Sequence, residues 1–152
     1  MDPIILKNKA ISDIKIADHI LVMTYPIVQD PKLLKIVLQK LHSAIKNSMM
    51  SLLYYEKKQK RISSFNESYM SMLTYIKKHL IKYNISPNYL IFLSELNDLF
   101  EYQKKSDIEF IRKDKFVFTN KDYKLKTLTK EDMKTLLIKG KLFIKEITDV
   151  VR

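Results

Sequence analysis

Four basic side chains fall within five residues, at Lys57, Lys58, Lys60 and Arg61. Ammonium and guanidinium groups bind phosphate oxygens, and a guanidinium can do so with two parallel hydrogen bonds. A predicted helix ends within this run, and the free carbonyls at a helix end favour cations, which accounts for one or two of the four. We therefore favour phosphate contact over an ordinary solvated face for this cluster, which we call the basic strip.

A second basic segment combines cations with aromatic rings between residues 104 and 118. In proteins that bind single-stranded nucleic acid, rings stack on bases while cations contact phosphates. Interleaved acidic residues weaken the local charge, so we leave open whether these cations contact phosphate or only solvent. The cations are Arg112, Lys113 and Lys115. Because buried phenylalanine is the common case, we expect the rings to anchor this segment in the core. The rings are Phe110, Phe116 and Phe118.

Polar residues recur every three or four positions between residues 32 and 46, which predicts one polar face of a helix. This face comprises Lys32, Lys35, Gln39, His42 and Lys46. Solvated helix faces normally mix both signs of charge, whereas no acidic residue occurs from residue 31 to residue 55. We therefore treat the lysines of this face, Lys32, Lys35 and Lys46, as an additional basic surface.

The net charge of +11 is unevenly distributed along the 152 residues. Residues 31–66 carry eight Lys or Arg against one acid, and residues 104–152 carry fourteen against eight. Residues 1–30 and 67–103 are each slightly acidic. Concentrated positive charge attracts polyanions, so RNA is the partner that this pattern favours. The abundance of Lys, Ile, Tyr and Asn also fits an AT-rich genome, which raises lysine content without any selection for binding.

The composition excludes several kinds of catalytic or cofactor site. A chain without cysteine has no disulfide, no thiolate zinc site and no cysteine nucleophile. Its single glycine, Gly140, rules out the glycine-rich loops that hold nucleotide phosphates. We interpret Gly140 as a point where a neighbouring helix approaches closely.

The histidines and the acidic residues do not indicate a metal site. The three histidines fall on separate predicted helices without a shared ligand spacing. They are His19, His42 and His79. Glu95, Asp98 and Glu101 recur at helical spacing, and we interpret this acidic ridge as a solvated face or a contact with a second subunit. We therefore expect no metal, no cofactor and no enzymatic activity.

The length and hydropathy of the chain are those of one ordinary domain. Hydrophobic residues make up 46% and charged residues 30%, and a chain of this length can bury a substantial core. The first residues lack the apolar run of a signal peptide, and no stretch approaches 18 uninterrupted apolar residues. We expect a single domain over residues 1–152, located in the cytoplasm and without membrane contact.

Helix start and stop signals predict an all-α bundle of about five helices, four of them long. We expect the first helix over about residues 8–23, ended by Thr24-Tyr25-Pro26, and the second from Asp30-Pro31 to about residue 58. The third is expected to begin with a capping box at Ser64 and Glu67 and to end at Asn84. Ser86-Pro87 and Thr129-x-x-Asp132 open the fourth and the last helix.

Between residues 104 and 129 the helical period fails. Residues 115–119 and 123–127 alternate with period two and are joined by residues 120–122, which predicts a short β-hairpin. A hairpin of two strands alone is only marginally stable in water. We therefore expect this insert, roughly residues 107–128, to pack on the bundle just before the last helix.

The order of helices and four short strings resemble the HEPN superfamily of helical RNA-associated domains, and they are also similar to small uncharacterised archaeal proteins. The strings are residues 30–34 (DPKLL), 54–56 (YYE), 60–62 (KRI) and 109–117 (EFIRKDKFV). HEPN ribonucleases carry an arginine followed, after a short spacer, by a histidine near the last helix. At the corresponding places Arg112 is followed by residues 117–119 (VFT) and Arg61 by residues 66–68 (NES), so the nuclease motif is absent. The resemblance implies a non-catalytic member that binds RNA, a nucleotide or a partner protein, commonly as a dimer.

We hypothesise that the chain is a non-enzymatic RNA-binding protein or ribonucleoprotein subunit, which contacts phosphates through the two basic segments. Sequence preference would be weak, because no string resembles a base-reading motif. The alternative is a dimeric interaction subunit that docks onto another protein, with its basicity mainly compositional. In that case the long second helix would expose part of its apolar face to a second chain.

Overall fold

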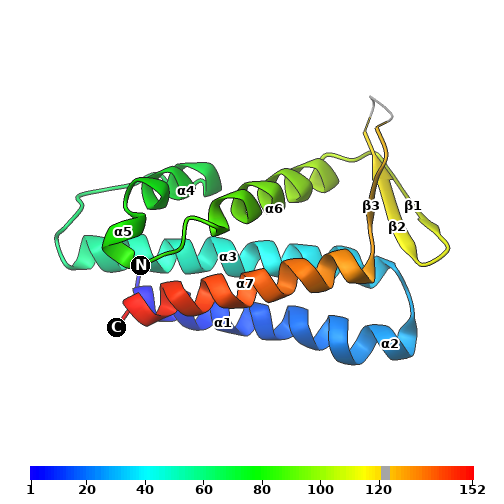
Figure 1. The fold of residues 1–152 in the computed structure, drawn as a ribbon, viewed down its shortest axis with the longest axis horizontal. Coiled ribbons are helices and arrows are strands. Elements are labelled where there is room, and N and C mark those ends of the chain that lie inside the picture. The colour runs from blue at the N-terminus through cyan, green and yellow to red at the C-terminus, as the bar shows by residue number, and fades with distance from the viewer. Residues whose placement is uncertain (121–123) are drawn as a thin grey trace.

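Helices build most of the molecule, and a small sheet lies at one end of them (Figure 1). The computed structural model describes residues 1–120 and 124–152. In chain order the elements are α1 (Pro3–His19), a π-helical turn (Ile20–Thr24), α2 (Tyr25–Val28), α3 (Lys32–Lys58), α4 (Tyr69–Lys78), α5 (Leu80–Tyr83), α6 (Tyr89–Lys104), β1 (Ile108–Arg112), β2 (Lys115–Thr119), β3 (Lys126–Leu128) and α7 (Lys130–Val150).

The central element is α3, which contacts α1, α4, α6, α7 and β2. Figure 1 shows α1 and α7 along one side of it, and α4 and α6 along the other. Residues 47–53 are all buried, so this part of α3 is enclosed on every side within one chain. The predicted start is confirmed, since the Asp30 carboxylate accepts the N–H of Lys32 at 3.0 Å, and so is the end at Lys58.

The first helix begins earlier than predicted and continues where a break was expected. It starts at Pro3, and the Asp2 carboxylate accepts a backbone N–H of the first turn at 2.9 Å. This is the same Asp–Pro signal that opens α3. A π-helical turn, in which the N–H of Tyr25 donates to the carbonyl of Ile20, then continues the helix into α2, whose first turn contains Pro26. The predicted interruption at residues 24–26 is therefore wrong.

The helix α4 begins at a different serine from the one predicted. The Oγ of Ser68 accepts the N–H of Ser71 at 3.2 Å, which makes Ser68 the N-cap. Glu67 instead accepts a hydrogen bond from the Tyr54 hydroxyl. The predicted capping box at Ser64 and Glu67 is therefore wrong, and both residues lie in the loop between α3 and α4.

Most of the remaining helix ends follow their sequence signals. Asn84 ends α5 with a φ of 55°, a left-handed conformation that asparagine tolerates. Ahead of α6, the Oγ of Ser86 accepts the N–H of Asn88 at 3.3 Å. At the start of α7, the hydroxyl of Thr129 accepts the N–H of Asp132 at 3.1 Å. The stop at Asn84 and the start at Thr129 are confirmed. The N-cap of α6 is Asn88, two residues after the predicted Ser86, and the predicted third helix is divided into α4 and α5 at His79.

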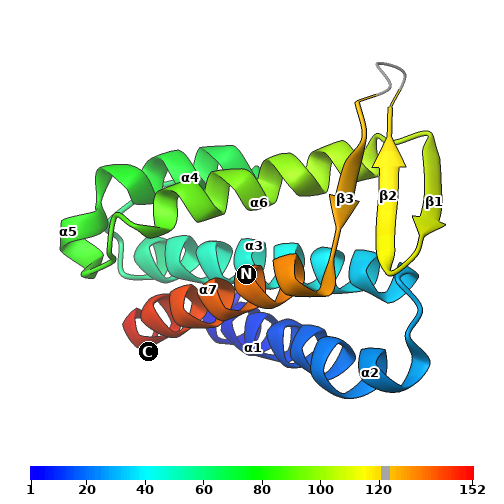
Figure 2. The ribbon, with the colours of Figure 1, turned by 45° about the vertical axis from the view of Figure 1, so that its right-hand side comes forward.

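The insert before α7 is a three-stranded antiparallel sheet, not a hairpin. Its strand order is β1-β2-β3, and the predicted hairpin corresponds to β2 and β3, with Phe116 opposite Leu128. Residues 121–123 of that predicted hairpin lie outside the described residues. Figure 2 shows the strands running across the helices, at the end of the bundle where α3 begins and α6 ends.

Two of the three phenylalanines of the second basic segment anchor the sheet on the bundle. Phe116 and Phe118 are buried as predicted, and the Phe118 ring lies 5.9 Å from the ring of Tyr102 on α6. Phe110 is 41% exposed, so the prediction that it is a core anchor is wrong. It pairs with Val117, and this register places it on the face of the sheet opposite to Phe116 and Phe118.

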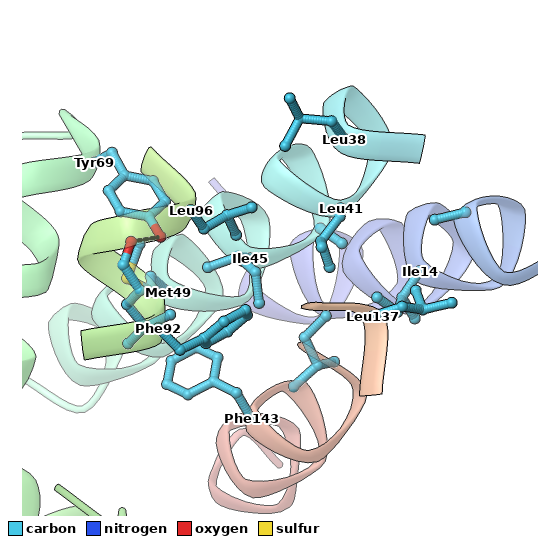
Figure 3. Packing of buried hydrophobic residues seen from close by; sticks show 14 of the residues in the cluster. Ile14, Leu38, Leu41, Ile45, Met49, Tyr69, Phe92, Leu96, Leu137 and Phe143 are labelled. Carbon is cyan, nitrogen blue, oxygen red and sulfur yellow. Dashed lines mark hydrogen bonds between the residues drawn. The ribbon is translucent and has the colours of Figure 1, made fainter. Parts of the chain in front are cut away.

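The helices α3 and α7 approach closely at Gly140, as predicted. A Cβ at this position would lie 2.5 Å from the Cδ1 of Leu41 and 3.6 Å from the Cδ1 of Ile14. Figure 3 shows Ile14, Leu41 and Leu137 in this contact between α1, α3 and α7. The glycine lets the three helices pack together, at a helix-propensity cost of about 1 kcal/mol relative to alanine.

Candidate nucleic-acid interface

The basic strip ends α3 in a Schellman motif. The N–H of Arg61 donates to the carbonyl of Glu56, and the N–H of Lys60 to the carbonyl of Lys57, both at 3.0 Å. Lys60 has a φ of 61°, in the left-handed conformation that glycine usually occupies in this motif. All four side chains of the strip are exposed, so the motif presents them to solvent at the helix end.

A buried carboxylate holds the surroundings of the strip together. Glu56 is 1% exposed, and its two oxygens accept hydrogen bonds from Arg61 and Lys82, each at 2.9 Å. Burial by itself raises the pKa of Glu56, but the hydrogen bonds and charges of Lys82 and Arg61 outweigh it, so that the pKa is lowered. Arg61 is therefore a structural partner as well as a surface cation, and the pairs tie the end of α3 to α5.

Three lysines from α4 and α5 extend the basic surface. Lys77 and Lys78 end α4, Lys82 lies on α5, and all three are exposed. Figure 1 shows α5 and the C-terminal end of α3 at the same end of the molecule. We call this surface the basic end (Lys57, Lys58, Lys60, Arg61, Lys77, Lys78 and Lys82). Sequence reasoning missed the three lysines because residues 67–103 are acidic on average, although cations in the last turn of a helix are a recognisable signal.

Two tyrosines support lysines of the basic end. The Nζ of Lys57 lies 5.9 Å from the ring centroid of Tyr54, and the Nζ of Lys82 lies 5.4 Å from that of Tyr83. Cations are attracted to the faces of aromatic rings at such distances. Both lysines stay exposed, so these contacts position their ammonium groups without removing them from solvent.

The second basic segment lies at the other end of α3. Arg112, Lys113 and Lys115 are exposed at the turn between β1 and β2, and the Tyr25 hydroxyl of α2 donates to a carbonyl of this turn at 3.5 Å. The 27 residues of α3 span about 40 Å, which is the approximate distance between this turn and the basic end. The structure therefore does not bring the two predicted segments together.

Acidic residues reduce the positive charge around the β1–β2 turn. Asp114 is part of the turn, and the Lys35 ammonium pairs with the Glu109 carboxylate at 3.0 Å. Of the additional basic surface, Lys32 is exposed near this turn, whereas Lys46 lines a groove farther along α3. The lysines of the predicted polar face therefore have three different environments.

That groove has a volume of about 860 Å³ and is lined by α3, α6, β1 and residues at the start of α4. The ring of His42 lines it, stacked between Tyr69 at 4.8 Å and Phe100 at 3.7 Å. His42 is buried, so it packs between the two rings and is not exposed on the polar face that helical spacing predicts. Its Nε2 lies 2.9 Å from the Oδ1 of Asn97, and burial lowers the pKa of His42. Both signs of charge line the groove, including Lys46 and Lys104 with Glu101 and Glu109.

The acidic ridge of α6 does not form one site. Glu95 and Asp98 line a cavity of about 500 Å³ together with Lys126 and Lys139, whereas Glu101 lines the groove. Elsewhere, His19 ends α1 and His79 lies between α4 and α5. Over residues 1–120 and 124–152, no group of three His, Cys, Asp or Glu side chains is placed to hold a metal ion.

Comparisons of the chain with protein-family models, curated proteins and solved structures find no match. Within the described part of the chain, no helix is both long and apolar enough to cross a membrane. Function is therefore inferred from the arrangement of side chains.

Proposed function

We propose that this protein binds RNA through the basic end, contacting phosphates and catalysing no reaction. The observation that carries the proposal is the gathering of seven exposed cations at one end of the molecule, from α3, the turn that follows it, α4 and α5. Between residues 31 and 94 the chain contains only two acids, Glu56 and Glu67. Glu56 pairs with Arg61 and Lys82, so it offsets one of the seven positive charges, and six remain in excess within the basic end.

Lysines dominate this surface, which favours contact with the RNA backbone over readout of bases. A lysine ammonium acts as a point charge on a flexible stem, and phosphate contacts carry no sequence information. The one arginine, Arg61, has part of its hydrogen-bonding capacity engaged by Glu56. We therefore expect binding with weak sequence preference and a strong dependence on salt.

The β1–β2 turn is a second contact in this proposal, through Arg112, Lys113 and Lys115. Because about 40 Å of helix separates it from the basic end, one RNA reaches both only by running along the molecule. Lys46 lies between the two ends on α3. A short RNA would occupy the basic end alone.

The resemblance to non-catalytic HEPN domains supports the same proposal, since that superfamily is associated with RNA. The chain lacks the arginine–histidine pair of the nucleases, and we propose a cytoplasmic RNA-binding protein or ribonucleoprotein subunit.

The test is a salt titration of the affinity for a fluorescently labelled structured RNA such as a tRNA. Replacing Lys57, Lys58, Lys77 and Lys78 by alanine should weaken binding. Each lost phosphate contact removes about 0.7–0.9 from the slope of log K against log salt, so the slope should fall by about three. Arg61 and Lys82 stay unchanged in this variant, because their pairs with Glu56 support the fold.

The matched control removes the same charge from exposed lysines elsewhere, at Lys9, Lys15, Lys134 and Lys139. It should leave the slope close to that of the unmodified protein. Equal losses in the two variants would mean that net charge, not the basic end, attracts the RNA, and this result would overturn the proposal.

A further inference from the structure

We propose that β1 pairs with β1 of a second copy of the chain, so that two sheets join into one across a two-fold axis. The strand order β1-β2-β3 leaves β1 at an edge of the sheet. All five of its residues are exposed, and its three apolar side chains, Ile108, Phe110 and Ile111, are 41–46% exposed. Natural edge strands usually carry protective features such as proline, outward lysines or a short length.

The hydrogen-bonding groups of β1 alternate between β2 and the open edge. The turn between β1 and β2 has two residues, so Arg112 and Lys115 form the hydrogen-bonded pair next to it. Alternation makes Phe110 and Ile108 the other residues bonded to β2. The N–H and C=O groups of Glu109 and Ile111 therefore point away from β2, and outside the ladder they have no other backbone partner among the described residues.

This pattern is self-complementary. An antiparallel pairing centred on Phe110 places Glu109 opposite Ile111 of the partner subunit, and Ile111 opposite the partner's Glu109. Both are residues with outward hydrogen-bonding groups, so the pairing forms four main-chain hydrogen bonds. A pairing centred on Glu109 would set two carboxylates opposite each other, which is unfavourable. A pairing centred on Ile111 would set Glu109 opposite the partner's Lys113, which lies in the turn and not in the strand, so its ladder would be shorter. The geometry thus favours the register centred on Phe110.

In this register Phe110 lies directly opposite the partner's Phe110. The pair is of the non-hydrogen-bonded kind, in which the Cα atoms are about 4.5 Å apart and the side chains are closest. Cross-strand aromatic pairs of this kind stabilise antiparallel sheets. The pairing would also cover the cavity of about 530 Å³ beside β1, which Ile36, Phe110 and Ile111 line.

Contacts within the protomer already fix the position of β1. The Glu109 carboxylate accepts hydrogen bonds from Lys35 of α3 at 3.0 Å and from the buried Gln103 of α6 at 2.8 Å. These contacts fix β1 against both helices, so pairing requires little further ordering. The dimer contact lies on the sheet edge and not on α3, whose apolar residues are largely buried within the protomer. The inference is independent of the proposed RNA binding.

Analytical ultracentrifugation over a wide concentration range tests the proposal. The unmodified chain should reach twice the protomer mass of 18.1 kDa. Ile111→Pro removes an outward N–H without breaking the β1–β2 ladder, and Phe110→Lys sets two like charges opposite each other. Both variants should be monomers. Ile81→Lys, a matched change at a 98% exposed residue of α5, should remain a dimer. Circular dichroism confirms that each variant is folded.

Cross-linking gives a readout that does not depend on destabilising variants. The chain has no cysteine, so Phe110→Cys introduces a single thiol. In the proposed register the two thiols face each other at a distance that a disulfide can bridge. Mild oxidation should give a covalent dimer for Phe110→Cys and not for Ile81→Cys. A monomeric unmodified chain, a dimer that survives Ile111→Pro, or equal cross-linking of the two cysteine variants would overturn the proposal.

Discussion

The Glu56 carboxylate and the Lys82 ammonium are 2.9 Å apart, although the residues lie on different helices and only Glu56 is buried. Arg61 binds the other carboxylate oxygen at the same distance. This arrangement is energetically asymmetric. Removing Glu56 leaves two cations that water can hydrate, whereas removing both cations leaves a buried charge without a partner.

Glu56→Gln should lower the free energy of unfolding by about 1–3 kcal/mol, because hydrogen bonds to a charged group are lost. The double variant Arg61→Ala/Lys82→Ala should be destabilised by more than the sum of the two single variants, since either cation alone still pairs with the carboxylate. Urea denaturation of the unmodified protein and these four variants measures the differences. Additive effects of the two single variants would contradict the shared role of Glu56.

The same cluster predicts acid sensitivity. Because the pKa of Glu56 is lowered from its ordinary value of 4.5 in the folded protein, its stabilising contribution is present above pH 4.5 and is lost as the pH falls through the lowered pKa. Glu56→Gln removes this titration. Its unfolding midpoint should therefore depend less on pH below 4.5 than that of the unmodified protein, and parallel pH profiles would contradict the prediction.

A second titration arises from His42 and falls in a different pH range. Burial is the main reason that its pKa lies below 6.5, opposed by the hydrogen bond with Asn97, and Lys46, Lys104 and Glu101 act on it as nearby charges. Since the folded protein disfavours the charged ring, stability is full above pH 6.5 and decreases as the pH falls from 6.5 through the lowered pKa.

His42→Phe keeps an aromatic ring between Tyr69 and Phe100 but cannot take up a proton. The variant should differ from the unmodified protein in the pH dependence of its unfolding free energy between about pH 7.5 and 5.5, whatever its absolute stability. His19 and His79 are present in both proteins, so the comparison isolates His42. An identical decrease in both proteins would show that His42 takes up no additional proton on unfolding in this range.

Local signals predicted much of the fold because they act within one turn of chain. The carboxylate of Asp30 and the hydroxyl of Thr129 bind backbone N–H groups two or three residues away, so their helix starts follow from the sequence alone. The same Asp–Pro signal at Asp2 opens α1 at Pro3, five residues before the predicted start. The strand β1 was missed because its adjacent Phe110 and Ile111 interrupt the alternation that marks strands.

The composition of the candidate site depended on contacts that no local pattern contains. Lys82 joins Arg61 only because both reach Glu56, which is 26 residues from Lys82 in the chain. Lys77, Lys78 and Lys82 share the segment 67–103 with the acids of α6, so the net charge of this segment hides the three lysines. In the structure those acids lie elsewhere on the surface. His42 shows the converse case, because helical spacing assigned it to a polar face while Tyr69 and Phe100, distant in sequence, cover its ring.

Lys60 allows the structural and the phosphate-binding roles of the basic strip to be separated. Its left-handed φ of 61° disfavours any residue with a Cβ by about 1 kcal/mol or slightly more, whereas glycine adopts this conformation freely. Lys60→Ala removes the charge and retains the unfavourable conformation, while Lys60→Gly removes both. The free energy of unfolding of the glycine variant should therefore exceed that of the alanine variant by about 1 kcal/mol, and urea denaturation measures this difference. Both variants lose the same ammonium group, so their RNA affinities and salt slopes should decrease equally. A difference in affinity between them would show that Lys60 acts through the shape of the turn and not through its charge.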